Sequence, residues 1–438
     1  MRRKFLVVVF WLCVWQLLAM AVDNPILLAT PAKTFAELWN LSRQASFWRV
    51  VFMSLGRIGL GFVSGFAAAV LLAVGARCCS PVEELLRVPM NLIKSVPVAS
   101  FAVILLIWRG PSFLSVAICF LVVLPNLYIS TLEGLRNTDG KLLEAATVFR
   151  MPFVTRLFYL YLPSLRPFLL SSLKISLGMC WKSGVAAEVI GTPDYSIGER
   201  LYLSKIYLNT AGVFAWTAVV IVLSILFEKM VLLAVDRFFL LQPRGRAPKG
   251  SRGVRTQESR GGFRLNGVCK SYGETQVIRN LSVTYAPGES VFLTGPSGSG
   301  KTTLLRLLSG LERADGGSIE GCVRVSLLFQ EDRLFEQCSA AKNVELVTGN
   351  AQTARKALEQ VLPADALDRP MRELSGGMKR RVALVRAMEA DSEAVLLDEP
   401  FAGLDEETIT RVSTYIRKRQ AGRTLLIATH IQPKQKRE

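Results

Sequence analysis

A glycine-rich stretch in the C-terminal half of the chain carries residues that could bind an anion. Val291–Thr294 leads into Gly-Pro-Ser-Gly-Ser-Gly-Lys-Thr, and leucines at helical spacing follow in "TTLLRLLSG". Glycines let the backbone curl so that successive N–H groups and the start of the next helix surround a phosphate. The complete pattern, between a strand and a helix, predicts a nucleotide-binding loop and argues against a chance glycine-rich turn.

Within this loop, we expect Lys301 to reach the β- and γ-phosphates and the Thr302 hydroxyl to ligate Mg²⁺. The expected nucleotide-binding residues of the loop are Gly295, Pro296, Ser297, Gly298, Ser299, Gly300, Lys301, Thr302 and Thr303.

Two consecutive acids follow a second apolar run, Ala394–Leu397. We expect Asp398 to bind Mg²⁺ and Glu399 to act as the general base, or to orient the attacking water. An apolar strand that ends in acids is common by itself, so this pair gains its meaning from the phosphate loop.

Between these motifs, "ELSGGMKRRVALVRAM" (373–388) resembles the signature of the ATPases of ATP-binding cassette (ABC) transporters. Ser375, Gly376 and Gly377 would open a helix whose bare N–H groups suit a γ-phosphate. The resemblance implies that this phosphate belongs to the ATP of a second subunit, and therefore that the protein is a dimer. Met378 stands where many relatives have glutamine.

The remaining positions of this family occur in order. Tyr272 in "KSYGET" matches the aromatic residue that stacks on adenine, and Gln330 in "LLFQEDRLF" matches a glutamine that senses Mg²⁺. Asp405 in "FAGLDEE" matches a further loop of the family. The only histidine of the sequence, His430 in "TLLIATH", matches the γ-phosphate sensor, although a lone histidine is usually a bystander. The resemblance implies ATP and Mg²⁺ as cofactors.

The first half of the chain has a different composition. Half of all residues are hydrophobic, and long, nearly uncharged runs concentrate before residue 242. The expected membrane spans are Phe5–Val22, Val50–Val74, Leu92–Trp108, Ser112–Thr131, Phe168–Ile190 and Ala211–Val235. Their number and the flanking basic residues both place the amino terminus and the segment 132–166 in the cytoplasm. The first run resembles a cleavable signal as an alternative, and the small residues of 54–75 suit close helix packing.

The segment "EAATVFRMPFVTRLFYLYLP" (144–163) resembles the cytoplasmic EAA loop of importer-type ABC permeases. The resemblance implies that Glu144, Ala145 and Ala146 couple the permease to its ATPase. Arg150 stands where relatives have a glycine, at a tight turn between helices. A basic loop that follows the membrane surface is the alternative.

Two ionisable residues in the fifth expected span, Lys182 and Glu188, have two open interpretations. They line a transport pathway, or they pair structurally and extend to the interface.

We therefore predict a membrane helical bundle of about six spans (1–241), a basic linker (242–262) and an α/β P-loop ATPase (263–438). The net charge of +18 is explained by basic residues that flank spans, so no nucleic-acid partner is expected. The eight cysteines show no metal-ligand spacing and are typical of a reducing compartment.

The resemblance, which extends over residues 30–240 to sulfonate, nitrate and taurine permeases, implies a homodimeric importer of a small anionic solute. It further implies an extracytoplasmic solute-binding protein and a location in the cytoplasmic membrane of a prokaryote. A pyrimidine-type thiamine precursor is an alternative substrate; an exporter and a signalling ATPase are alternative functions. The ATPase portion is short for this family, and we still expect it to hydrolyse ATP.

Overall fold

The computed structural model describes residues 2–24, 26–240, 262–296, 298–322 and 324–430. The chain divides into two compact units. Met1–Asn137 and Pro163–Leu241 form the first, which we call the helical unit. Thr138–Leu162 joins Gln242–Glu438 in the second, the α/β unit. The segment that contains the EAA motif is therefore part of the α/β unit.

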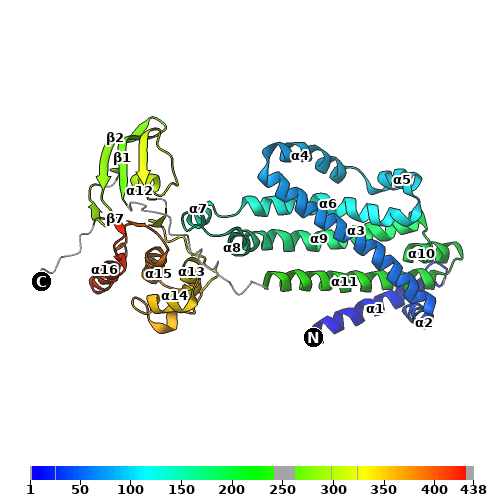
Figure 1. Ribbon diagram of the computed structural model, residues 1–438. Coiled ribbons are helices and arrows are strands. Elements are labelled where there is room, and N and C mark those ends of the chain that lie inside the picture. Colours follow the sequence, from blue (N-terminus) through cyan, green and yellow to red (C-terminus); the bar gives the residue numbers. More distant parts are fainter. Residues whose placement is uncertain (1, 25, 241–261, 297, 323, 431–438) are drawn as a thin grey trace. The chain divides into compact units, whose positions relative to one another are not determined.

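The helical unit consists of long helices joined by short connections (Figure 1). Its helices are α1 (Arg2–Val22), α2 (Pro31–Ser42), α3 (Ala45–Cys78), α4 (Ser80–Ser95), α5 (Val98–Arg109), α6 (Pro111–Arg136), α9 (Leu162–Gly191), α10 (Ile197–Ile206) and α11 (Thr210–Leu240).

Helices α3 and α6 pack closely because glycines of α3 face α6. A Cβ atom on Gly61 would lie 2.5 Å from the Cβ of Cys119 and from the carbonyl oxygen of Val116. Gly65 faces the backbone of Phe120 in the same way, at 3.1 Å. The expectation of close helix packing in this stretch is confirmed.

Within the described residues, three helices are long and apolar enough to cross a membrane: Ala45–Cys78, Pro111–Arg136 and Thr210–Phe239. The pair Ser80–Ser95 and Ser100–Arg109, bent by 103°, would add a fourth if it forms one broken span. This count falls short of the expected six. Helix α9 has 30 residues, but Lys174, Lys182 and Glu188 lower its mean hydropathy. In α1 the described side chains include the shorter apolar stretch Val9–Val22, and the expected span Phe5–Val22 extends beyond them.

Glu188 in α9 is fully buried and has structural partners. Its carboxylate accepts hydrogen bonds from Ser54 Oγ at 2.7 Å and from the backbone N–H of Gly198 at 3.3 Å. Arg57 Nη1 lies 3.7 Å away. These contacts tie α3 and the start of α10 to α9 and favour structural pairing for Glu188, whereas Lys182 is exposed.

The described residues of the α/β unit form two sheets. An antiparallel sheet has the order β2 (Thr275–Tyr285), β1 (Phe263–Tyr272), β4 (Gly316–Gly321). A parallel sheet has the order β3 (Ser290–Leu293), β7 (Thr424–Ala428), β6 (Ala394–Asp398), β5 (Val325–Leu328). Strands β6 and β7 are buried along their whole length, as is usual for central strands covered on both faces.

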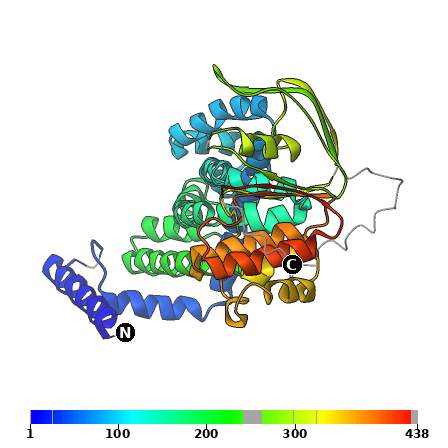
Figure 2. The same ribbon diagram turned by 90° about the vertical axis from the view of Figure 1, so that its left-hand side faces the viewer.

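Helices pack against these sheets in the described part of the unit. They are α7 (Gly140–Val148), α8 (Phe153–Arg156), the π-helical turn η1 (Leu157–Tyr161), α12 (Lys301–Leu308), α13 (Ala340–Thr348), α14 (Ala351–Leu358), η2 (Ala364–Ala366), η3 (Met371–Glu373), α15 (Gly376–Glu389) and α16 (Glu406–Gln420). Helices α15 and α16, orange and red, lie side by side (Figure 2). The expected order of a helical portion and an α/β P-loop unit is confirmed.

Candidate functional site

The carboxyl ends of the parallel strands bring the predicted residues together at one edge of the sheet. Strand β3 leads into the glycine-rich loop, β6 ends at Asp398, and His430 follows β7. A cavity of about 380 Å³ at this edge is lined by Tyr272, Val277, Gly298, Ser299, Gly300, Lys301, Thr302, Thr303, Gln330, Asp398, Glu399 and His430. Such an edge is the usual ligand site of an open parallel sheet. Ser297 lies outside the described residues.

The glycine-rich loop has the backbone shape that a phosphate needs. Gly298 (φ +81°) and Gly300 (φ +87°) are left-handed, and Gly300 caps the start of α12. Lys301 Nζ donates to the carbonyl oxygens of Gly295 at 2.8 Å and Pro296 at 3.0 Å, which holds the ammonium group over the loop. The loop therefore presents a helix N-terminus and a positive charge to the same cavity.

Gly300→Ala is expected to weaken ATP binding about tenfold, because left-handed backbone costs a Cβ-bearing residue about 1–2 kcal/mol. The added Cβ would also lie 3.1 Å from Cγ1 of Val277. Equilibrium nucleotide binding checks this expectation. Gly273→Ala is the matched control, since Gly273 is also left-handed (φ +58°) but has open space around its Cβ position. Equal affinities for the two variants would contradict the expectation.

Asp398 and Thr302 form the oxygen-rich part of the cavity. Burial raises the pKa of Asp398, and a hydrogen bond with Thr302 opposes that shift. A buried carboxylate, a hydroxyl and the nearby amide of Gln330 supply the oxygen ligands that Mg²⁺ prefers. A dication would also compensate the buried carboxylate, so the donor set fits the expected metal.

Glu399 and His430 face each other across the cavity. Nε2 of His430 lies 3.5 Å from Oε1 of Glu399, and the backbone N–H of His430 donates to Oε2 at 3.4 Å. Glu399 has a left-handed backbone (φ +48°), held in part by its own N–H, which donates to the carbonyl of Ala428 at 2.8 Å. Strained backbone is typical of functional residues that the surrounding structure holds in place.

Sequence reasoning missed Arg380, on the first turns of α15. Its guanidinium donates to the carbonyl oxygens of Phe329 (2.7 Å) and Gln330 (3.1 Å). It also donates to those of Asp398 and Glu399, the latter at 2.7 Å, and pairs with Asp332 at 3.0 Å. One buried side chain thus joins the backbone of the loop that contains Gln330, which we call the glutamine loop, to the end of β6. In the sequence, the run "KRR" indicates only that Arg380 lies in a helix, and it does not reveal these partners.

The signature residues lie apart from this cavity. Ser375 caps α15, with its Oγ accepting from the N–H of Met378 at 3.4 Å, and Gly376 and Gly377 form the first turn. A Cβ on Gly376 would meet nothing within 4 Å, so this helix N-terminus is open.

The EAA segment packs on the α/β unit through α7. Ala145 and Ala146 are fully buried, Ala145 in the cluster with Leu305 and Leu327 and Ala146 in the cluster with Phe335. Small side chains at these positions let the helix approach closely.

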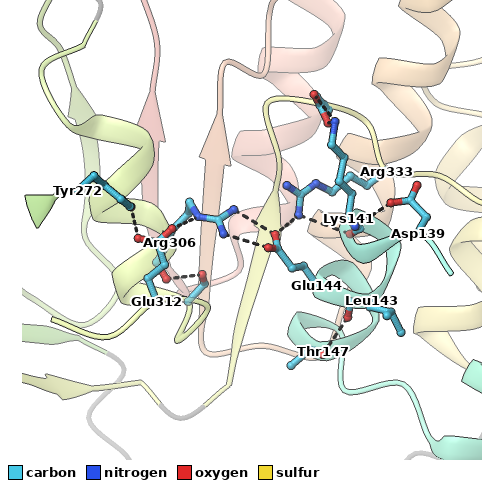
Figure 3. Close-up of polar contacts among 11 residues, drawn as sticks. Asp139, Lys141, Leu143, Glu144, Thr147, Tyr272, Arg306, Glu312 and Arg333 are labelled. Carbon is cyan, nitrogen blue, oxygen red and sulfur yellow. Dashed lines mark hydrogen bonds and ion pairs between the residues drawn. The ribbon is translucent and has the colours of Figure 1, made fainter. Parts of the chain in front are cut away.

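Ionic contacts surround Glu144 at this interface (Figure 3). Both Nη atoms of Arg306 lie 3.1 Å from its carboxylate oxygens, and Arg333 also pairs with it. The hydrogen bond from Arg306 lowers the pKa of Glu144, so it is ionised at neutral pH. Lys141 pairs with Glu331 at 2.7 Å.

Arg150 ends α7 in a conformation that glycine usually adopts. It adopts left-handed backbone (φ +50°) directly after α7. Its N–H donates to the carbonyl of Thr147 at 3.0 Å, and that of Met151 to the carbonyl of Ala146 at 2.9 Å. This is the Schellman pattern that ends many helices, here with arginine in the glycine position.

Comparison with known proteins gives a family match for each half of the chain. Residues 61–238 match the family model of the binding-protein-dependent transport system inner membrane component, and residues 278–402 match that of the ABC transporter. An aliphatic sulfonates import ATP-binding protein of Rhodococcus jostii is 45% identical over 33% of this chain and 55% of its own length. A second such protein from the same organism is 37% identical over 39% of this chain and 73% of its own length. A sulfate/thiosulfate import ATP-binding protein of Synechococcus elongatus is 36% identical over 36% of this chain and 51% of its own length.

The fold and the site define an ATP-binding cassette preceded by a membrane permease portion. The chain belongs to the ABC transporter family and joins an importer-type permease to its ATPase. It spans only 55% of the length of the first of these relatives.

Proposed function

We propose that the chain is a half-transporter that imports a small anionic solute with energy from ATP hydrolysis. The observation that carries this proposal is the docking of α7 on the α/β unit of the same chain, through Glu144 and the buried alanines. A segment of this type, placed between membrane helices, gives an ATPase mechanical access to a permease. Helices α3, α6 and α11 are long and apolar enough to span a membrane, which supports a membrane location for the permease, and we propose the cytoplasmic membrane of a prokaryote.

The site residues have distinct proposed roles in hydrolysis. Lys301 and the loop N–H groups bind the β- and γ-phosphates, and Tyr272 stacks on the base. Thr302, Gln330 and Asp398 would hold Mg²⁺, which supplies charge neutralisation at the phosphates when bound. Glu399 orients and deprotonates the attacking water, and His430 holds that water and the γ-phosphate in line.

The open start of α15 supports a homodimer. Ser375, Gly376 and Gly377 do not line the cavity of their own subunit, so their N–H groups are available to the γ-phosphate bound by a second copy. Two copies would then enclose two ATP molecules, and closure of the pair would move both α7 helices. The domain division proposed is permease 1–241, linker 242–262 and ATPase 263–438.

The substrate class proposed is a sulfonate, taurine or nitrate, delivered by an extracytoplasmic solute-binding protein. The relatives are named for the import of sulfonates or of sulfate and thiosulfate, and these names support an anionic substrate.

Uptake into proteoliposomes tests the function. The full chain is reconstituted with ATP inside, and labelled taurine, an alkanesulfonate or nitrate is presented outside with a candidate binding protein. We expect ATP-dependent accumulation and stimulation of hydrolysis by the matching binding protein. Accumulation of solute in inside-out vesicles on addition of ATP would identify an exporter instead. Hydrolysis that no binding protein stimulates, without movement of any solute, would contradict transport.

A further inference from the structure

A row of hydrogen-bonded side chains runs from the base side of the cavity to α7 (Figure 3). The Tyr272 hydroxyl donates to the Glu312 carboxylate, and Nε of Arg306 donates to the same carboxylate. The two Nη atoms of Arg306 donate to Glu144. Four side chains thus connect the proposed adenine-stacking residue with α7, which we call the coupling helix.

Two members of this row are shared between competing partners. Arg306 divides its guanidinium between two carboxylates, those of Glu312 and Glu144. Glu312 in turn accepts from both Tyr272 and Arg306. Because a carboxylate that accepts from a phenol has less negative charge to offer an arginine, a stronger bond to Tyr272 shifts Arg306 toward Glu144.

The two middle members of the row, Glu312 and Arg306, are sheltered enough for this competition to matter, whereas Tyr272 and Glu144 at its ends are more exposed. The side chains of Glu312 and Arg306 are 17% and 23% exposed, so water screens their interaction less than that of a surface pair. Glu144 is held on its other side by Arg333, whose own side chain is 12% exposed. A change in the strength of the Arg306–Glu144 bond therefore changes how tightly α7 is held, because the bond between Arg333 and Glu144 stays in place.

We propose that Glu312 and Arg306 are positioning residues that report the presence of a base on Tyr272 to the docking of α7 at Glu144. The inference rests on the proposed function. It adds a path of communication to α7 that starts at the nucleotide base and is separate from the contacts with the phosphates. A base packed on the Tyr272 ring holds the phenol against Glu312, and Arg306 then binds Glu144 more strongly. Binding of ATP thereby tightens the coupling helix onto the ATPase.

This arrangement predicts opposite effects for two conservative variants. Tyr272→Phe keeps the ring but frees Glu312 to draw Arg306 away, so α7 docks more weakly. Glu312→Gln removes the competing charge, so Arg306 stays with Glu144 and α7 docks more tightly. Both variants lose the response to the base, and the double variant behaves like Glu312→Gln alone, because Glu312 lies between the other two.

Hydrogen–deuterium exchange of the α7 amides in the full chain, in nanodiscs with EDTA to prevent hydrolysis, measures the docking. Saturating ATP is expected to slow this exchange about three- to tenfold in the unaltered chain. Inorganic tripolyphosphate, which fits the phosphate loop but has no base, is expected to leave it unchanged. Glu320→Gln, an exposed carboxylate on β4, is the control and should respond like the unaltered chain.

The possible outcomes separate the inference from the function on which it rests. If ATP fails to bind the unaltered chain in a parallel fluorescent-nucleotide displacement assay, the proposed function itself is refuted. If ATP binds but exchange of α7 does not change, or tripolyphosphate slows it equally, the proposed link from Tyr272 to α7 is refuted and the proposed function is not. The same holds if Tyr272→Phe and Glu312→Gln, with unfolding temperatures matching the unaltered chain, shift the exchange in the same direction or retain the ATP response.

Discussion

Glu399→Gln is expected to lower ATP turnover by about 10²–10⁴-fold while ATP affinity changes little. Glutamine keeps the size of the side chain and its contact with His430, but it cannot accept a proton from the attacking water. The phosphate loop and Lys301 remain unchanged, so the nucleotide still binds. Phosphate release and equilibrium nucleotide binding, measured on the reconstituted chain, separate the two effects.

Glu407→Gln is the matched control for this variant, because its carboxylate is 87% exposed on α16 and removal of its charge leaves the site intact. His430→Ala is expected to lose most hydrolysis with ATP binding nearly unchanged. If Glu399 and His430 act as one unit, the double variant will be no slower than Glu399→Gln alone. Turnover within threefold of the unaltered chain in Glu399→Gln would remove Glu399 from its proposed role.

Arg380→Met is expected to lower kcat by at least about tenfold and to destabilise the α/β unit by about 2–4 kcal/mol. Methionine fills much of the volume but leaves the carbonyl oxygens of Gln330 and Glu399 without their buried donor. The glutamine loop and the end of β6 then lose their common support. Steady-state kinetics and thermal unfolding of the full chain check both parts.

A merely structural role for Arg380 would lower the unfolding temperature alone. A positioning role predicts in addition a loss of kcat, at a temperature where the variant remains folded, with KM for ATP little changed. Arg380→Lys should restore part of the activity, since an ammonium group reaches some of these carbonyls but lacks the planar fork. Lys379→Met removes the same charge from the neighbouring, partly exposed position and should leave both measurements near those of the unaltered chain.

The grouping of the site residues could be predicted because it follows from local patterns. Lys301, Asp398 and His430 each come soon after an apolar strand, and the carboxyl ends of parallel strands share one edge of a sheet. Their roles remain predictions. Arg380 could not be found in this way, because its partners lie 18 to 51 residues away in sequence and meet it only through the packing of α15. Glu312 has one near partner, Arg306, six residues away, but its bond to Tyr272 spans 40 residues and follows only from packing.

The membrane portion illustrates another limit of sequence patterns. A run of apolar residues predicts a helix of sufficient length, and α3, α6 and α11 agree with that prediction. Helix α9 is long, but one of its charged residues, Glu188, has buried partners in Ser54 and Gly198 that composition does not reveal. The exchange of glycine for Arg150 was visible in the sequence, whereas its left-handed backbone within a complete helix-ending pattern was not.

The assignment of residues 138–162 to the α/β unit has a consequence for dissection of the protein. A fragment that begins at β1 would lack α7, so the apolar surface that Ala145 and Val148 cover beside Leu305 and Leu327 would face water. Such a patch favours aggregation. A soluble ATPase fragment would therefore need residues 138–162 restored, for example as an added peptide, and the affinity of that peptide would measure the strength of the coupling contact directly.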